Sequence, residues 1–313
     1  MNPILQQLGF AEDDRVVIIH ADDFGMCHAT IPAVAELFDA GLVSSAATMT
    51  PCSWFPAVAA YARANPAADI GVHTTLTCEW DVYRWGPISS RDRASGMIDE
   101  EGYFYRSTEA AQKYGDPVAV AAELNAQLDI ALTAGIDVTH VDSHMGTVFS
   151  PQLTPAYLAV AARGRVPPMV PRMSEERMRE EQIPEEMIAF ALDAARRLEA
   201  QGIPLMDDIL GMPLDQHENR IDVAKERLGG LKPGLSYFIL HPAVDTPELR
   251  AIAPDWRARV ADYQAFCSAE LRAWVRENGL QVIGWRALRD AMRDEHRIAR
   301  VNQESGEDIE RLL

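Results

Sequence analysis

Two adjacent aspartates, Asp22 and Asp23, follow closely on the apolar run Val16–Ile19. The run is uncharged and rich in β-branched residues, so it is typical of a buried strand. Two carboxylates at the exit of such a strand are costly to bury unless a charge compensates them, and a divalent cation is the usual partner. For the pair taken alone, a helix cap followed by a turn is the alternative, because aspartate is strongly preferred at helix N-termini.

Two histidines occupy equivalent positions farther along the chain. His73 lies in an apolar segment at residues 70–76, and His144 comes shortly after the segment that ends at Val141. One aspartate and two histidines form a metal-binding set that leaves coordination positions open for water and substrate. The alternative for each histidine is a core residue whose ring is satisfied by a backbone carbonyl. We therefore treat these residues as a candidate metal site.

Composition and charge bound the class of protein. The chain has 313 residues, 48% of them hydrophobic and 24% charged, which is typical of a soluble globular protein with a sizeable core. Its net charge of −18 repels phosphate backbones and anionic lipids, so we expect neither nucleic acid nor membrane as a partner. We find no signal-peptide pattern and no apolar segment of membrane-spanning length, and we therefore expect a cytoplasmic protein.

Apolar strand-like segments alternate with helical patterns along most of the chain. Between residues 120 and 132 valine and leucine repeat every four residues, which predicts a helix that ends at Gly135. A further helix is expected at about residues 256–277. Repeated strand–helix units with nearly continuous apolar strands indicate parallel strands buried on both faces. Seven or eight such units favour an α/β fold of the (β/α) barrel type, as a single domain over residues 1–313.

An open, doubly wound sheet that binds a dinucleotide is the main alternative to the barrel. No Gly-x-Gly-x-x-Gly motif follows the first strand, which weakens that interpretation. One long segment, at about residues 80–115, interrupts the strand–helix alternation. It is rich in Gly, Ser, Arg and aromatic residues and has no clear period, although residues 102–105 look strand-like and predict a small hairpin. In a barrel this excursion would overhang the active site.

The candidate chemical residues obey one geometric rule. In (β/α) barrels the active site forms at the carboxyl ends of the strands. At or just past predicted strand ends lie Asp22, Asp23, His73, Asp142, His144 and His241. Four unrelated segments that obey one rule are stronger evidence than any single motif. His241 precedes a proline, so an ordinary turn is the alternative there.

These motifs resemble those of the YdjC-like carbohydrate deacetylases, which include chitooligosaccharide deacetylases and deacetylases of hopanoid synthesis. The matching segments are His-Ala-Asp-Asp-Phe-Gly at 20–25, Gly-Val-His-Thr-Thr-Leu-Thr at 71–77, His-Val-Asp-Ser-His at 140–144 and His-Pro at 241–242. Looser matches are residues 170–172 and Asp207 before Gly211. The resemblance spans residues 15–293. The chain departs from it at 145–147, where family members more often have a further histidine, and this bears on sugar specificity rather than on the metal site.

The resemblance implies a metal-dependent enzyme that removes an acetyl group from an N-acetylated sugar or oligosaccharide and releases acetate. Carried onto this sequence, Asp23, His73 and His144 would hold one divalent metal ion, Zn²⁺ or Mg²⁺. Asp22 would be the catalytic base and His241 the acid. Another metal-dependent barrel hydrolase, such as an amidohydrolase or a phosphoesterase, is the first alternative. A non-catalytic sugar-binding protein is the second.

Four further residues are candidates for binding the substrate. Asp142 could contact the substrate or orient a metal-bound histidine, since such histidines usually need an oriented partner, and a helix cap is its structural alternative. Arg172 could orient a carboxylate or form a surface ion pair. Trp80 and Trp85 could stack on sugar rings or pack the excursion against the barrel or a second subunit. The partner we expect is a small-molecule or oligosaccharide substrate, and the aromatic loop and the C-terminal helix are candidate faces for a homodimer.

Overall fold

The computed structural model describes residues 2–180, 182 and 185–294. The end of the predicted domain, residues 295–313, lies outside the described residues. The strands are β1 Arg15–Phe24, β2 Ser45–Thr48, β3 Ile70–Thr74, β4 Val138–Ser143, β5 Asp208–Gly211, β6 Gly234–Leu240 and β7 Leu280–Val282. They form one sheet in the order β4-β3-β2-β1-β6-β5, with β7 also paired to β1, and every pairing is parallel. The predicted parallel α/β architecture is thus confirmed.

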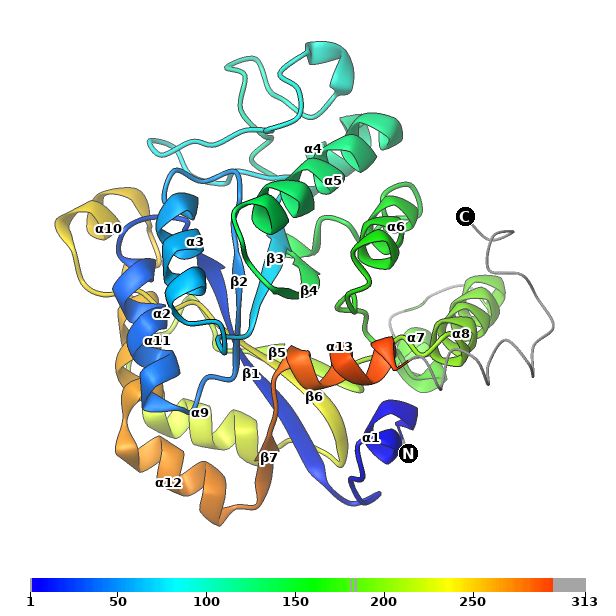
Figure 1. Ribbon diagram of the computed structural model, residues 1–313, viewed down its shortest axis with the longest axis vertical. Coiled ribbons are helices and arrows are strands. Elements are labelled where there is room, and N and C mark those ends of the chain that lie inside the picture. The colour runs from blue at the N-terminus through cyan, green and yellow to red at the C-terminus, as the bar shows by residue number, and fades with distance from the viewer. Residues whose placement is uncertain (1, 181, 183–184, 295–313) are drawn as a thin grey trace.

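Helices surround the strands (Figure 1). They are α1 Pro3–Gln7, α2 Thr30–Ala40, α3 Phe55–Ala64, α4 Thr108–Tyr114, α5 Pro117–Thr133, α6 Thr154–Gly164, α7 Glu175–Glu180, α8 Glu185–Ala200, α9 Arg220–Gly229, α10 Pro247–Ile252, α11 Trp256–Cys267, α12 Ala269–Glu277 and α13 Trp285–Arg293. None of these helices is both long and apolar enough to span a membrane. The helix expected at 256–277 is two helices, because Ser268 takes an extended conformation and caps the second one through Leu271 N.

The segment at residues 167–172 links the two edges of the sheet. It exchanges two backbone hydrogen bonds with Val141 of β4, and two more with Met206, just before β5. Single parallel bridges at the same places, Val141 with Pro168 and Pro171 with Met206, mark the connection. The regular ladders alone do not close, but with this segment the strands run around in a barrel-like arrangement.

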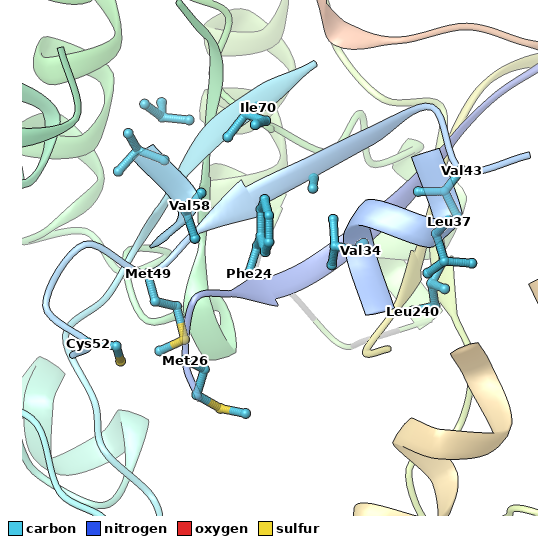
Figure 2. Packing of buried hydrophobic residues seen from close by; sticks show 14 of the residues in the cluster. Phe24, Met26, Val34, Leu37, Val43, Met49, Cys52, Val58, Ile70 and Leu240 are labelled. Atoms are coloured by element: carbon cyan, nitrogen blue, oxygen red, sulfur yellow. The ribbon is translucent and has the colours of Figure 1, made fainter. Parts of the chain in front are cut away.

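The two faces of β1 pack against different partners. Val17, Ile19 and Ala21 face the larger core, which lies between the strands and the outer helices. Figure 2 shows part of this core, where Phe24 at the end of β1 packs among residues of the segments around β2 and β3 and of α2 and α3. Because side chains alternate along a strand, Val16, Ile18, His20 and Asp22 face the barrel interior. That inner face is the one that matters for the site.

The inner face changes character along the strand. Val16 and Ile18 belong to a smaller core that also contains Leu5 of α1 and Trp285 and Leu288 of α13. These two helices contact one another and so form an apolar floor at the amino-terminal end of the barrel. Two residues farther on, the same face of β1 carries the fully buried His20, followed by Asp22. The interior therefore passes from apolar to polar in the direction of the strands.

The excursion after β3 is largely irregular, as predicted. It contains a short 3-10 turn, Arg93–Ser95, and an antiparallel bridge between Ile98 and Phe104, which corresponds to the expected small hairpin. A backbone hydrogen bond from Cys78 N to the carbonyl of Tyr105 ties the later part of the excursion to the segment that directly follows β3. In Figure 1 the excursion is the cyan segment at the top of the view.

The interior is packed tightly beside His140, and this leads to the first prediction. A Cβ added at Gly71 would lie 2.4 Å from the ring of His140, which is fully buried and stacked on Trp285 at a ring distance of 4.8 Å. We expect Gly71→Ala to lower the free energy of unfolding by ~1–3 kcal/mol or more, since overpacking forces a shift of the ring. Denaturant unfolding measures this change.

Gly230 supplies the matched control, because a Cβ there meets only ordinary contacts at 3.6 Å. Gly230→Ala should leave stability unchanged or raise it slightly, since alanine reduces the freedom of the unfolded chain. Equal effects of the two substitutions would contradict the packing described for Gly71.

Candidate functional site

Polar side chains from four strands meet at the carboxyl ends of the sheet. Asp22 and Asp23 close β1, His73 lies in β3, His144 directly follows β4, and His241 directly follows β6. Contacts between these residues range from 3.3 to 3.8 Å. The structure thus brings together the two proposed catalytic residues and the three proposed metal ligands.

The backbone at Asp23 explains how both aspartates reach the same site. Along a regular strand, adjacent side chains point to opposite faces, so one of the two would face the outer helices. Asp23 instead has φ +62°, and the pairing of β1 with β2 shifts register between Ala21 and Phe24. Left-handed backbone is uncommon outside glycine but is tolerated by aspartate. This local irregularity aims the second carboxylate into the barrel mouth.

Three donor atoms have the spacing of ligands to a common metal ion. His144 Nδ1 lies 3.3 Å from Asp23 Oδ1 and 3.3 Å from His73 Nε2, and His73 Nε2 lies 3.6 Å from Asp23 Oδ1. Donors bound about 2.0–2.2 Å from one ion lie roughly 3–3.6 Å apart. Asp23 Oδ1 is also buried without a hydrogen-bond donor. By spacing and donor chemistry, these residues fit a divalent cation.

Each of the two histidines has a carboxylate behind it. His73 and Asp142 are cross-strand neighbours in the register of β3 and β4, and His73 Nδ1 lies 2.8 Å from Asp142 Oδ1. His144 Nε2 lies 2.9 Å from Glu79 Oε2. Carboxylates in these positions fix the tautomer and the orientation of a metal-binding ring. The remaining oxygen of Asp142 accepts a hydrogen bond from the hydroxyl of Tyr237 at 2.7 Å.

Arg259 of α11 neutralises part of the charge at Asp23. Its guanidinium donates to Asp23 Oδ2 at 2.7 Å and to Asp255 Oδ1 at 2.9 Å. Burial would raise the pKa of Asp23, but the attraction of Arg259 and then of His144 outweighs it and holds that pKa well below its usual range. Asp23 is therefore ionised, as a metal ligand must be.

Asp22 lies between the metal-binding group and His241. Its Oδ2 is 3.8 Å from His73 Nε2 and 3.6 Å from His241 Nε2. Burial lowers the pKa of His241, although Asp23 and Asp22 oppose this, so its imidazole is mainly neutral at pH 7. The backbone N–H of His241 donates to Asp262, which in turn pairs with Arg220. This pair fixes the turn that carries His241.

The aromatic residues of the excursion stand beside the site. Trp85 lies 6.3 Å from the ring of His144, and its indole N–H donates to the carbonyl of Thr77. Trp80 contacts Trp85 edge to face, and Arg259 lies 5.4 Å from its ring. Both indoles are largely buried, at 8% and 4% exposure, so they form a wall of the barrel mouth rather than an open platform.

The structure does not bring Arg172 to this site. Its guanidinium pairs with Glu199 and with Asp207, the latter at 3.1 Å. Asp207 directly precedes β5, and its carboxylate also accepts from Leu235 N at the start of β6. Arg172 therefore lies at the amino-terminal ends of the strands, away from the candidate site. It forms ion pairs there, as in the alternative considered for it.

Two residues of the site, Glu79 and Arg259, lie outside the motifs from which the site was predicted. Glu79 follows the 71–77 segment by two residues, and its position close to a strand end is the feature that could have indicated it. Arg259 lies on α11, more than two hundred residues from its partner Asp23. Nothing in the sequence marks this arginine as buried, although the residue is only 4% exposed.

The fold and the site define an α/β protein with a barrel-like strand arrangement and an Asp–His–His group at its strand ends. The model of the YdjC-like protein family matches residues 16–277. A carbohydrate deacetylase from Thermus thermophilus is 34% identical over 293 residues, covering 92% of this chain and 99% of that protein. The chain therefore belongs to the YdjC-like family, as the motifs implied.

Two other proteins extend the comparison. A chitooligosaccharide deacetylase from Yersinia enterocolitica is 29% identical over 165 residues, which cover 51% of this chain and 60% of that protein. The solved structure of a provisionally named cellobiose-phosphate cleavage protein from Enterococcus faecalis superposes with a TM-score of 0.70 at 22% identity, covering 88% of this chain and 99% of that one. This last likeness concerns the fold alone.

Arg259 gives the prediction for this site. In the presence of EDTA, Arg259→Met should lower the free energy of unfolding by ~3–5 kcal/mol, because it removes the arginine that offsets the buried charge of Asp23. Arg250→Met is the control, since Arg250 forms an exposed ion pair with Asp245 and also lies over an aromatic ring. The control should change stability little. A similarly small change in both variants would contradict the role given to Arg259.

Proposed function

We propose that this protein is a metal-dependent hydrolase that removes the acetyl group from an N-acetylated sugar, of the N-acetylglucosamine type or an oligosaccharide of it. Family membership and the names of the relatives support a carbohydrate deacetylase. The observation that carries the proposal is the position of Asp22. Its Oδ2 lies beside the metal-binding group and within 3.6 Å of His241, and no lysine or arginine of the described chain pairs with it.

Asp23, His73 and His144 would hold the ion through Oδ1, Nε2 and Nδ1. A divalent cation bound there would lower the pKa of a water and polarise the carbonyl of the acetyl group. Two nitrogen donors and one oxygen donor are compatible with several ions, including Zn²⁺ and Mg²⁺. Asp142 and Glu79 would orient the two histidines from behind.

Asp22 is the base in this proposal. Its carboxylate takes a proton from the water as the water oxygen adds to the amide carbon, so a tetrahedral species forms. Collapse of that species breaks the C–N bond, and the leaving amine then needs a proton. The products are acetate and a free amino sugar.

His241 would deliver that proton. Because its pKa is lowered, the imidazole is neutral before reaction and cannot start as the acid. A proton taken up by Asp22 can pass over the 3.6 Å gap to His241 Nε2 and from there to the nitrogen of the amine. The cycle then closes with Asp22 ionised and His241 neutral again, and no proton is left over.

Trp80 and Trp85 would bound the sugar on one side. Their burial favours edge contacts with the substrate over broad stacking on a sugar face. Asp142 would act on His73 rather than on the substrate, since both of its oxygens are already engaged. Arg172 has no part in substrate binding in this proposal.

The proposal predicts acetate release that depends on Asp22. Metal-loaded protein should release acetate from N-acetylglucosamine or its short β-linked oligomers, and Asp22→Asn should reduce kcat by about 10²–10⁴-fold, the usual contribution of a general base. Asp207→Asn, a matched change at the opposite end of the strands, should leave the rate unchanged. Acetate measured by proton NMR reports both rates.

Failure of the metal-loaded wild type to release acetate from any N-acetylated sugar would refute this function. Equal rates for wild type and Asp22→Asn would refute the role of the base alone.

Metal content gives an independent prediction. Freshly purified protein should contain one equivalent of a divalent ion per chain, and His73→Ala and His144→Ala should each lose it, because both remove a donor of the same site. Elemental analysis of protein dialysed against metal-free buffer measures the ratio, with His28→Ala as a control outside the group. Two equivalents per chain would favour another class of metal-dependent barrel hydrolase, such as a phosphoesterase.

A further inference from the structure

We propose that His20 is a positioning residue, a buried imidazolium that holds the base Asp22 and the orienting carboxylate Asp142 in fixed relation to one another. The role rests on the function proposed above, because it assigns His20 to that same reaction. His20 touches neither the substrate region nor the three metal-binding donors. It would act entirely through the two carboxylates.

The geometry places one ring nitrogen between two acids. His20 Nε2 lies 3.1 Å from Asp22 Oδ1 and 3.1 Å from Asp142 Oδ2. The other nitrogen, Nδ1, lies 2.9 Å from the hydroxyl of Ser45, its cross-strand neighbour on β2. The ring is completely buried, so water does not replace any of these partners. A lone pair on Nε2 would face two carboxylates and be repelled, so this nitrogen carries a proton.

Charge balance gives His20 its second proton as well. Within the described chain, neither Asp22 nor Asp142 forms an ion pair with a lysine or an arginine; their cationic candidates are histidines. His73 is assigned to the metal, and His241 is neutral for the reason given above. Two buried carboxylates without a cation would be unfavourable in a low-dielectric interior. His20 is the partner that meets both of them.

The groups that surround His20 are consistent with a charge at this ring alone. Facing it are Asp22 on β1, Ser45 on β2, Asp142 and His140 on β4, and Tyr237 on β6. Burial lowers the pKa of His140, and this outweighs the opposing effect of Asp142; the neighbouring His20 lowers that pKa further, so His140 is neutral. Burial also acts to lower the pKa of His20, but Asp142 and then Asp22 outweigh it and raise that pKa to about 9.

The consequence is a link between two catalytic tasks. Asp142 uses Oδ1 to orient His73 and Oδ2 to meet Tyr237 and His20. Asp22 uses Oδ1 to meet His20, which leaves Oδ2 turned toward His73 and His241. One ring therefore sets the direction of the base and supports the carboxylate behind a metal-binding histidine.

The first test is spectroscopic and does not depend on activity. In ¹⁵N-histidine-labelled protein loaded with Zn²⁺ or Mg²⁺, the His20 ring should show two protonated nitrogens at pH 7.5, while His140 shows one. Contacts to the ring of Tyr237 assign His20 without a variant. An unprotonated Nε2 at His20 would overturn the proposal. A second equivalent of metal that is lost in His20→Gln would overturn it too, and would indicate a metal site at His20, His140 and Asp142.

The second test separates positioning from packing. His20→Met should lower kcat by about 10- to 100-fold with KM within threefold, as expected for the loss of short contacts between a charged ring and two carboxylates. His20→Gln keeps an N–H near the position of Nε2 and should recover part of the loss. His140→Met is the matched control, a buried histidine that does not contact Asp22, and it should retain kcat within threefold. One equivalent of metal should remain in all three variants.

Equal falls in kcat for His20→Met and His140→Met, or no recovery in His20→Gln, would show that His20 acts only through core packing and would refute the positioning role. If a variant fails to fold, the NMR measurement on wild-type protein still decides the matter. An inactive wild type would refute the deacetylase function, whereas a neutral His20 in an active enzyme would refute the positioning role alone.

Discussion

The burial of three carboxylates in one barrel mouth is the constraint on which the rest of this structure depends. Asp22, Asp23 and Asp142 are all at most 8% exposed. In such surroundings an uncompensated charge is far more costly than any packing contact nearby can offset. Arg259 and the histidines around these acids offset part of that cost, and the spacing of Asp23, His73 and His144 would allow a cation to offset the remainder. Several of the groups that compensate these three carboxylates are also the groups to which the proposed chemistry is assigned.

The barrel interior is organised in layers that fit this constraint. At the floor, α1 and α13 close the amino-terminal end with apolar side chains. Above them lies a middle layer of His20, His140 and Tyr237, whose rings contact one another or Trp285. The acids, His73 and His144 lie above that layer. Each layer has the polarity that its distance from solvent allows, and the alternation along β1 connects all three.

Local sequence patterns and one rule of topology were enough to predict part of this structure. The apolar strand-like segments predicted the parallel sheet, and the carboxyl-end rule predicted that five residues lie close together: Asp22, Asp23, His73, His144 and His241. Contacts between residues far apart in the sequence could not be predicted in this way. Arg259 meets Asp23 only because α11 packs beside the mouth. Only a weak motif match suggested Arg172 as a substrate contact, and a short segment between two strands gives no local sign of which end of the barrel it occupies.

The left-handed backbone of Asp23 has a bearing on how substitutions there are interpreted. At φ +62°, aspartate and asparagine are favoured among residues with a side chain, and most others strain the chain. Replacement by alanine would thus remove a carboxylate of the candidate metal site and also release the bend that turns two neighbouring carboxylates to one side. Asparagine retains the bend and changes only the donor. At this position one residue has to supply both the left-handed backbone and the carboxylate, so few substitutions would keep both.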